Sequence, residues 1–150
     1  MALSNGTKRR MVIALADRNA GNEVIGAVGL YGGFRIGASA AVASSSGDCQ
    51  AVPDSGGAPG TYRVMFPAVN AQIQSIDWLN VSGFTPRNPT AAETAAALVT
   101  GFNFDPSLKQ WYITVQIVGI DSQAVLSSPP VGFTIGVRAS VTLLQSANAL

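Results

Sequence analysis

Hydrophobic and polar positions alternate strictly near the end of the chain. Residues 132 to 144, "GFTIGVRASVTLL", place apolar side chains at the odd positions from Phe133 to Leu143. The even positions from Thr134 to Thr142 hold polar residues or glycine. A period of two is that of a β-strand with one buried face. The pattern therefore predicts a strand here.

The same alternation predicts further strands. It recurs in residues 34 to 42, 61 to 66 and 109 to 120. In the last of these, Trp111 falls on the predicted inward face and Tyr112 on the outward one. Residues 72 to 84, "QIQSIDWLNVSGF", change parity midway, which predicts a bent or bulged strand.

Two segments have helical patterns instead. Residues 7 to 19, "TKRRMVIALADRN", space their apolar residues by three to four, and Asn22 can cap a further turn through Val28. Within residues 86 to 101, "TAAE" is a capping box that leads into alanines. We expect a helical N-terminal arm and one short helix in a loop.

Turn-forming residues fill the stretch from 44 to 60, which predicts a surface loop with a short strand around Cys49 to Val52. Short strands separated by glycine and proline turns favour a mainly β fold, a β-sandwich or jelly roll. We therefore expect an arm at 1–32 followed by a β-sandwich domain at 33–150.

Composition narrows the class of protein. Charged residues make up 11% of the 150 residues, against about 25% in typical soluble domains. The net charge of +1 argues against nucleic acid as a partner, and no apolar run is long enough to predict a membrane span. The single cysteine, Cys49, allows no internal disulfide, which fits assembly in a reducing cytosol.

The residue types that usually carry catalysis are scarce. The chain has no histidine, which removes the commonest general base and metal ligand. Cys49 follows Asp48, a neighbour that raises a thiol pKa. The candidate carboxylates for glycoside hydrolysis are Asp77, Asp105 and Asp121, of which the last two fit turn positions better. We expect no enzyme activity and no catalytic residues.

Ligand sites are equally weak in the sequence. Asp48 and Asp54 offer only two carboxylates with no calcium-loop spacing, and "GAVGLYGG" at 26–33 lacks the spacing of a phosphate loop. We expect no metal and no cofactor. Trp78, Trp111 and Tyr112 could form an aromatic sugar-binding surface, and Tyr112 is the one expected to face outward.

A weakly charged body rich in small and β-branched residues suits a surface covered by other subunits. In residues 9 to 28, "RRMVIALADRNAGNEVIGAV" resembles an N-terminal segment of tailed-bacteriophage structural proteins, with its "ALADR" and "A-x-N-E" elements. The stretches "GTYRVMFPA", "WYITVQIVGID" and "GFTIGVRASVTLL" are similar in style to the β-sandwich bodies of capsid decoration (cement) proteins and of fibre modules.

This resemblance implies a noncatalytic homotrimer on the exterior of the virion that binds the major capsid protein and stabilises the head. Its N-terminal arm would anchor to the capsid or strap trimer partners together. The expected capsid or subunit contacts are Arg9, Arg10, Met11, Leu15, Arg18 and Tyr112. The alternatives are a head-fibre, tail-fibre or spike module that binds host glycan, and a cytokine-like or complement-like trimeric jelly roll, which would need an export signal.

Overall fold

The structure is a computed structural model that describes residues 24–66, 71–84, 95–108 and 110–145. Within these residues the chain is mainly β, with eight strands and one short 3-10 helix. The elements are β1 (Val24–Ile36), η1 (Ala38–Ala40), β2 (Val42–Gly47), β3 (Gln50–Pro53), β4 (Thr61–Met65), β5 (Ala71–Phe84), β6 (Ala95–Asp105), β7 (Gln110–Gly119) and β8 (Thr134–Gln145).

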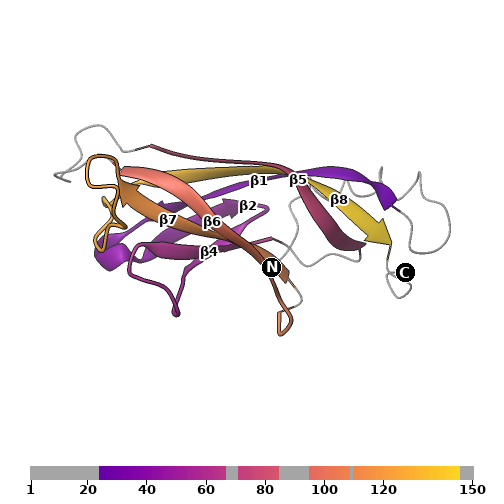
Figure 1. Cartoon of the computed structure of the whole chain (residues 1–150), viewed down its shortest axis with the longest axis horizontal. Helices are drawn as coiled ribbons and strands as arrows, with labels where there is room; N and C mark the ends of the chain where they lie inside the picture. The colour runs from indigo at the N-terminus through magenta and orange to yellow at the C-terminus, as the bar shows by residue number, and fades with distance from the viewer. Residues whose placement is uncertain (1–23, 67–70, 85–94, 109, 146–150) are drawn as a thin grey trace.

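The strands form two antiparallel four-stranded sheets. The first sheet has the order β2-β1-β8-β5, and the second has the order β3-β4-β7-β6. Figure 1 shows the long strands β1, β5 and β8 along one side of the molecule and β4, β6 and β7 along the other. The strand nearest the N-terminus, β1, pairs with the last strand, β8, so the first sheet joins distant parts of the chain.

One hydrophobic core lies between the sheets, built by the alternation of their strands. Phe34 of β1 and Tyr62 of β4 face each other with ring centroids 5.4 Å apart. The predicted inward residues of β4 are buried, and so are Phe133 and the inward residues of β8 from Ile135 to Val141. Together with the buried Ile113, Val115 and Ile117 of β7, they form one cluster to which both sheets contribute side chains. The alternation predicted for these three strands is confirmed.

Residues 34 to 42 form a hairpin and not the single strand that their alternation predicted. β1 ends at Ile36, η1 follows, and β2 returns along β1 with Phe34 opposite Ser45. Ser39 and Ala40 have positive φ angles of 54° and 58°, which turn the chain. Small residues tolerate such a turn. The alternation of apolar and small residues in the sequence therefore runs through the turn without revealing it.

The helical turn predicted through Val28 is wrong from Val24 onward. Residues Val24 to Arg35 pair with β8, which supplies the backbone hydrogen bonds that an isolated helical turn would lack. The expected boundary at residue 32 therefore falls inside β1. The remainder of the predicted N-terminal helix lies outside the described residues.

The short loop helix is also wrong from Ala95 onward. Ala95 to Gly101 belong to β6, whose pairing with β7 begins at Ala95 opposite Gly119. Alanine favours helices by less than about 1 kcal/mol per residue, which sheet pairing readily overrides. Residues 86 to 94 of that prediction lie outside the described residues.

The predicted irregularity in residues 72 to 84 is confirmed, because β5 shifts register against β8 between Ile73 and Ser75 and again between Ile76 and Trp78. The predicted short strand around Cys49 to Val52 corresponds to β3, although β2 also occupies part of the expected loop. Among the described residues, no helix has the length and apolar character needed to cross a membrane.

Candidate functional site

The structure places one of the six predicted contact residues. Arg9, Arg10, Met11, Leu15 and Arg18 lie outside the described residues. Tyr112 lies on β7, with the guanidinium carbon of Arg63 5.0 Å from its ring centroid. Arg63 Nε in turn donates to Asp54 Oδ1 at 3.0 Å. One face of the Tyr112 ring is therefore covered by a cation that an aspartate holds in place.

Of the three candidate catalytic aspartates, Asp105 stabilises a local turn. Asp105 Oδ1 accepts hydrogen bonds from the Ser107 hydroxyl at 2.6 Å and from the N–H groups of Ser107 and Leu108 at 2.9 and 3.1 Å. These bonds, the Ser107 hydroxyl first, lower the pKa of Asp105. The turn interpretation of Asp105 is confirmed. Asp121 lies in the turn after β7, and the side chain of Asp77 lies outside the described residues.

Cys49 and its acidic neighbour are buried. Asp48 Oδ2 accepts a hydrogen bond from the backbone N–H of Tyr31 at 2.9 Å, which fixes the β2–β3 connection to β1. Burial first, and the Asp48 charge second, raise the pKa of the Cys49 thiol from 9.0 to about 12. A thiol in this state is a poor nucleophile at neutral pH. The described residues contain no group of three or more potential metal-ligating side chains.

Four of the ten large apolar side chains that are exposed among the described residues lie on β6, an edge strand of the second sheet. We call this surface the apolar edge; it consists of Leu98, Val99, Phe102 and Phe104. Phe102 stacks on Trp111 of β7 with centroids 4.5 Å apart, and Phe104 tilts against the same ring at 5.2 Å. Trp111 lies on the predicted inward face and packs against the core, although it is only partly buried.

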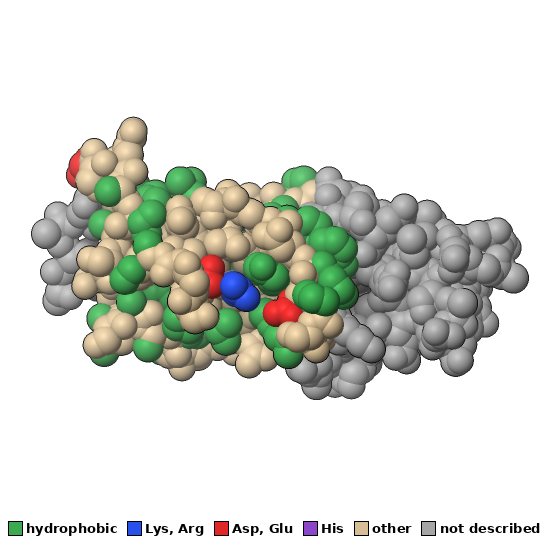
Figure 2. All heavy atoms as spheres, turned by 60° about the horizontal axis from the view of Figure 1, so that its bottom comes forward, with side chains coloured by type: hydrophobic (Ala, Val, Ile, Leu, Met, Phe, Trp, Pro, Cys, Tyr) green, Lys and Arg blue, Asp and Glu red, His purple; other side chains and the backbone are tan. Residues whose placement is uncertain are grey.

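The apolar edge is exposed because β6 ends its sheet. Phe102 lies opposite Ile113 and therefore shares its inward face, yet Ile113 is fully buried while Phe102 is 37% exposed. Core side chains cover β7 but do not extend over all of β6. Figure 2 shows one face of the molecule, on which charged side chains are few and hydrophobic side chains lie among polar ones.

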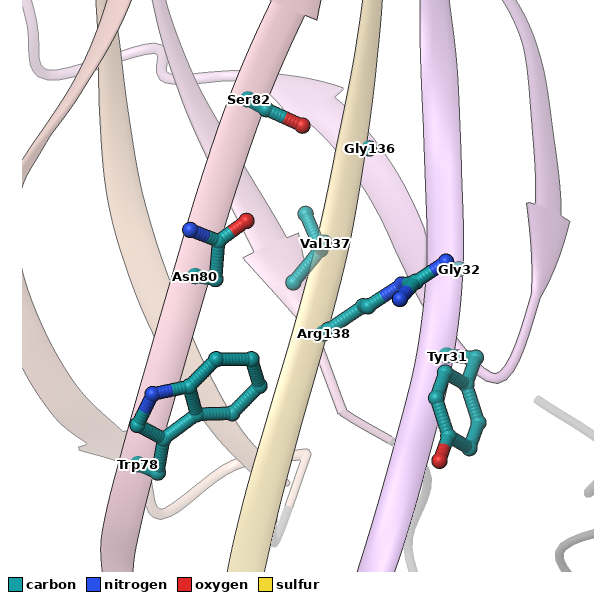
Figure 3. Close-up of a pocket in the computed structure, with 8 residues that line it drawn as sticks. All are labelled: Tyr31, Gly32, Trp78, Asn80, Ser82, Gly136, Val137 and Arg138. Carbon is teal, nitrogen blue, oxygen red and sulfur yellow. The ribbon is translucent and has the colours of Figure 1, made fainter.

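A second surface lies on the outward face of the first sheet. Tyr31 of β1, Arg138 of β8 and Asn80 of β5 are directly opposite one another and form one cross-strand row. Trp78 of β5 lies two residues before Asn80, and its ring points toward β8 in Figure 3. These four residues, with Ser82 and Gly136, line a hollow of about 670 Å³ that we call the outer groove.

Glycine provides the floor of the outer groove. The next outward row on this sheet is Gly33, Gly136 and Ser82, in which two strands offer no side chain. A second hollow of about 360 Å³ continues past this row to Arg35 and shares Ser82 and Gly136 with the first. The outer groove therefore continues across the sheet from Trp78 toward Arg35.

The sequence interpretation missed the residues of this groove. It kept Tyr112 as the outward aromatic and placed Trp78 in a strand of uncertain parity. The register shift between Ile76 and Trp78 decides which face Trp78 takes, and its side chain is 55% exposed. Tyr31 lies in the glycine-rich residues 26–33, which the sequence interpretation compared only with a phosphate loop, although Tyr31 occupies the alternation of β1. The alternation of β8 did place Arg138 outward.

Comparisons of this chain with protein-family models, with curated proteins and with solved structures found no match.

Proposed function

We propose that this chain is a noncatalytic structural protein of a tailed-phage virion that binds the outer capsid surface and stabilises the head. The apolar edge is the observation that carries this proposal. It places four exposed hydrophobic side chains along an edge strand of eleven residues. The resemblance of residues 9 to 28 to phage structural proteins is the reason for proposing a phage virion as the assembly.

An edge strand of this kind needs a partner. Edge strands expose unpaired N–H and C=O groups, and soluble proteins normally protect them with charges, proline or short length. Along β6 the single charged residue is Asp105, at its end. Exposed apolar surface commonly marks a contact between proteins. On β6 it occupies both faces, because Leu98 lies opposite the outward Gln116 whereas Phe102 lies opposite the inward Ile113. The apolar edge suits the contact between copies of the chain in a trimer.

The arrangement of strands supports a β-sandwich of the jelly-roll type. The outermost strands in sequence, β1 and β8, are neighbours in the first sheet, and β4 and β7 are neighbours in the second. Such pairing between distant strands is typical of Greek-key and jelly-roll connections. The β1–β2 hairpin, whose two consecutive strands pair in the same sheet, is added to that jelly-roll pattern.

Avidity would supply the strength of capsid binding. A trimer meets several capsid sites at fixed spacing, so modest individual contacts add up to tight attachment. Arg9, Arg10 and Arg18 of the N-terminal segment provide the charges for that attachment, and the body provides the contacts between copies. Such a mechanism needs no catalytic residue and no cofactor.

The first test is the mass of the purified protein by light scattering, followed by sedimentation with expanded phage capsids. We expect a trimer that pellets with capsids at a saturable stoichiometry. Phe104→Lys should weaken the trimer, because it buries a charge in the contact. Val131→Lys, at a side chain 60% exposed outside the apolar edge, is the matched control and should leave it intact. A monomer that ignores capsids would overturn the proposal.

The arm is tested separately by removing residues 1–23, which leaves every described strand in place. We expect the truncated protein to stay folded and trimeric but to occupy fewer capsid sites. Full occupancy of the capsid sites would exclude the arm as the anchor and would mean that the β-sandwich body makes the capsid contact.

The alternative function, a fibre or spike module that binds host glycan, has one observation in its favour. The outer groove combines exposed aromatic rings with polar side chains on a sheet face.

A further inference from the structure

We infer that the outer groove is a binding site for an acidic oligosaccharide, one that carries carboxylates such as those of uronic or sialic acid. This inference goes beyond capsid attachment and does not depend on it. Three properties of the groove support it: exposed aromatic rings, a glycine floor that is open at Gly136, and positive charge that no described outward acidic residue of the sheet opposes.

The aromatic rings lie on both sides of β8. Trp78 on β5 is 55% exposed and Tyr31 on β1 is 50% exposed, and Figure 3 shows the strand of Arg138 between them. Large aromatic side chains usually lose most of their surface on folding, so two rings exposed in the same groove are unusual. A flat exposed ring offers an apolar surface to the C–H face of a sugar.

Packing requires glycine at Gly33, where an added Cβ would lie 2.6 Å from the Ile135 carbonyl oxygen, but not at Gly136. A Cβ atom added to Gly136 would come no closer than 3.6 Å to Ser82 Oγ, an ordinary contact, and its φ angle is not positive. A glycine inside a strand lowers stability by about 0.5–1 kcal/mol relative to alanine. Gly136 therefore leaves open a space that packing does not need, as expected where a ligand approaches the backbone.

The charge of this face is one-sided. Arg138 and Arg35 are its two described cations, and none of the described outward residues of the first sheet is acidic. The Arg138 guanidinium carbon lies 5.9 Å from the Tyr31 ring centroid, and within the described part of the chain Arg138 forms no ion pair. Its planar donors suit a carboxylate, which they can bind through two hydrogen bonds.

The remaining groups suit hydroxyls. Asn80 carries an amide that both donates and accepts, and Ser82 carries a hydroxyl that does the same. Both face the groove from β5 in Figure 3. An acidic oligosaccharide satisfies the whole set: a sugar ring on Trp78, hydroxyls on Asn80 and Ser82, and a carboxylate on Arg138.

Single-stranded nucleic acid also stacks on aromatic rings and binds arginine. It needs a series of cations along its phosphates, since each neutralised phosphate adds to affinity. The groove offers only two arginines, one toward each end, and the whole chain has a net charge of +1. The acidic oligosaccharide is therefore the better match.

Calorimetric titration of the full-length chain tests this inference. The probes are an oligogalacturonate, its methyl ester, an oligomer of sialic acid and a single-stranded oligothymidylate. We expect at least one of the two acidic oligosaccharides to bind, and binding to weaken roughly tenfold or more when its carboxylates are esterified or when salt is raised. Equal binding of the ester, tighter binding of the oligothymidylate, or no binding of either acidic probe would overturn the inference.

Variants then locate the site. Trp78→Ala, Arg138→Gln and Gly136→Val should each weaken binding of the acidic probe by roughly tenfold or more, the last by filling the floor. Arg63→Gln, which removes a cation from the second sheet, is the matched control and should bind normally. Circular dichroism checks that each variant is folded, and light scattering that its mass is unchanged. Undiminished binding by folded Arg138→Gln and Gly136→Val would place the ligand elsewhere and overturn the inference.

Discussion

At the scale of single residues, Gly33 and Gly136 face each other across β1 and β8 but differ in what surrounds them. A Cβ at Gly33 would lie 2.6 Å from the carbonyl oxygen of Ile135, whereas one at Gly136 meets nothing closer than 3.6 Å. We expect Gly136→Ala to leave the free energy of unfolding unchanged or raise it by about 0.4–1 kcal/mol. Gly33→Ala should lower it by about 1–3 kcal/mol, because the strands must separate.

Urea unfolding of the two alanine variants measures this difference. The two substitutions have the same chemistry in the same row, so each controls for the other. An equal loss of stability in both would mean that the space above Gly136 is not open.

The buried thiol makes a pH prediction. The pKa of Cys49 is raised from 9.0 to about 12 and that of Tyr62 from 10.0 to about 12, chiefly by burial. Both groups ionise more readily in the unfolded chain, so their contribution is fully present below pH 9 and is lost as pH rises toward 12. We expect the free energy of unfolding to fall across this range.

Cys49→Ala separates the two contributions. The decline in that variant should begin about one pH unit later, since Tyr62 alone remains and its ordinary pKa is 10.0. Denaturant titrations from pH 7 to 11 measure it. A decline that begins at the same pH in both proteins would assign it to other groups.

At the scale of elements, β7 gives the clearest test that a strand of this fold has one buried face and one face turned away from the core. Ile113 is fully buried and Thr114 points to the other face. We expect Ile113→Ala to lower the free energy of unfolding by about 2–5 kcal/mol through lost burial and a cavity. Thr114→Ala, the neighbouring control, should change it by less than about 1 kcal/mol. Chemical denaturation compares them, and similar losses would contradict the assigned faces.

The same strands explain what could be predicted from the sequence. β4, β7 and β8 each have a buried face and a polar face, so alternation located them and their core residues. Ala95 to Gly101 carry a helical preference that only pairing with distant β7 overrides, and no local pattern reveals such a partner. The face taken by Trp78 depends on a register shift, and the row of Tyr31 and Arg138 joins residues far apart in sequence. The outer groove could therefore not be predicted from the pattern of residues along the sequence.

At the scale of the whole molecule, β8 holds the first sheet together. It lies between β1 and β5 and pairs with both along most of its length. Deletion of residues 133–150 should therefore abolish folding, because it removes the central strand and the core residues from Phe133 to Val141. Deletion of 146–150 alone keeps every described strand and should stay folded. Circular dichroism and thermal unfolding measure both, and a cooperative transition in the longer deletion would contradict this role.

The burial of Cys49 has a practical consequence for experiments on this chain. It is the only thiol in the sequence, and the native fold denies it both access to solvent and ionisation at neutral pH. A thiol reagent would therefore modify the protein only when the β2–β3 connection opens, after which the pKa of Cys49 returns toward 9.0. The rate of labelling therefore measures that opening, and the wild-type chain needs no engineered probe.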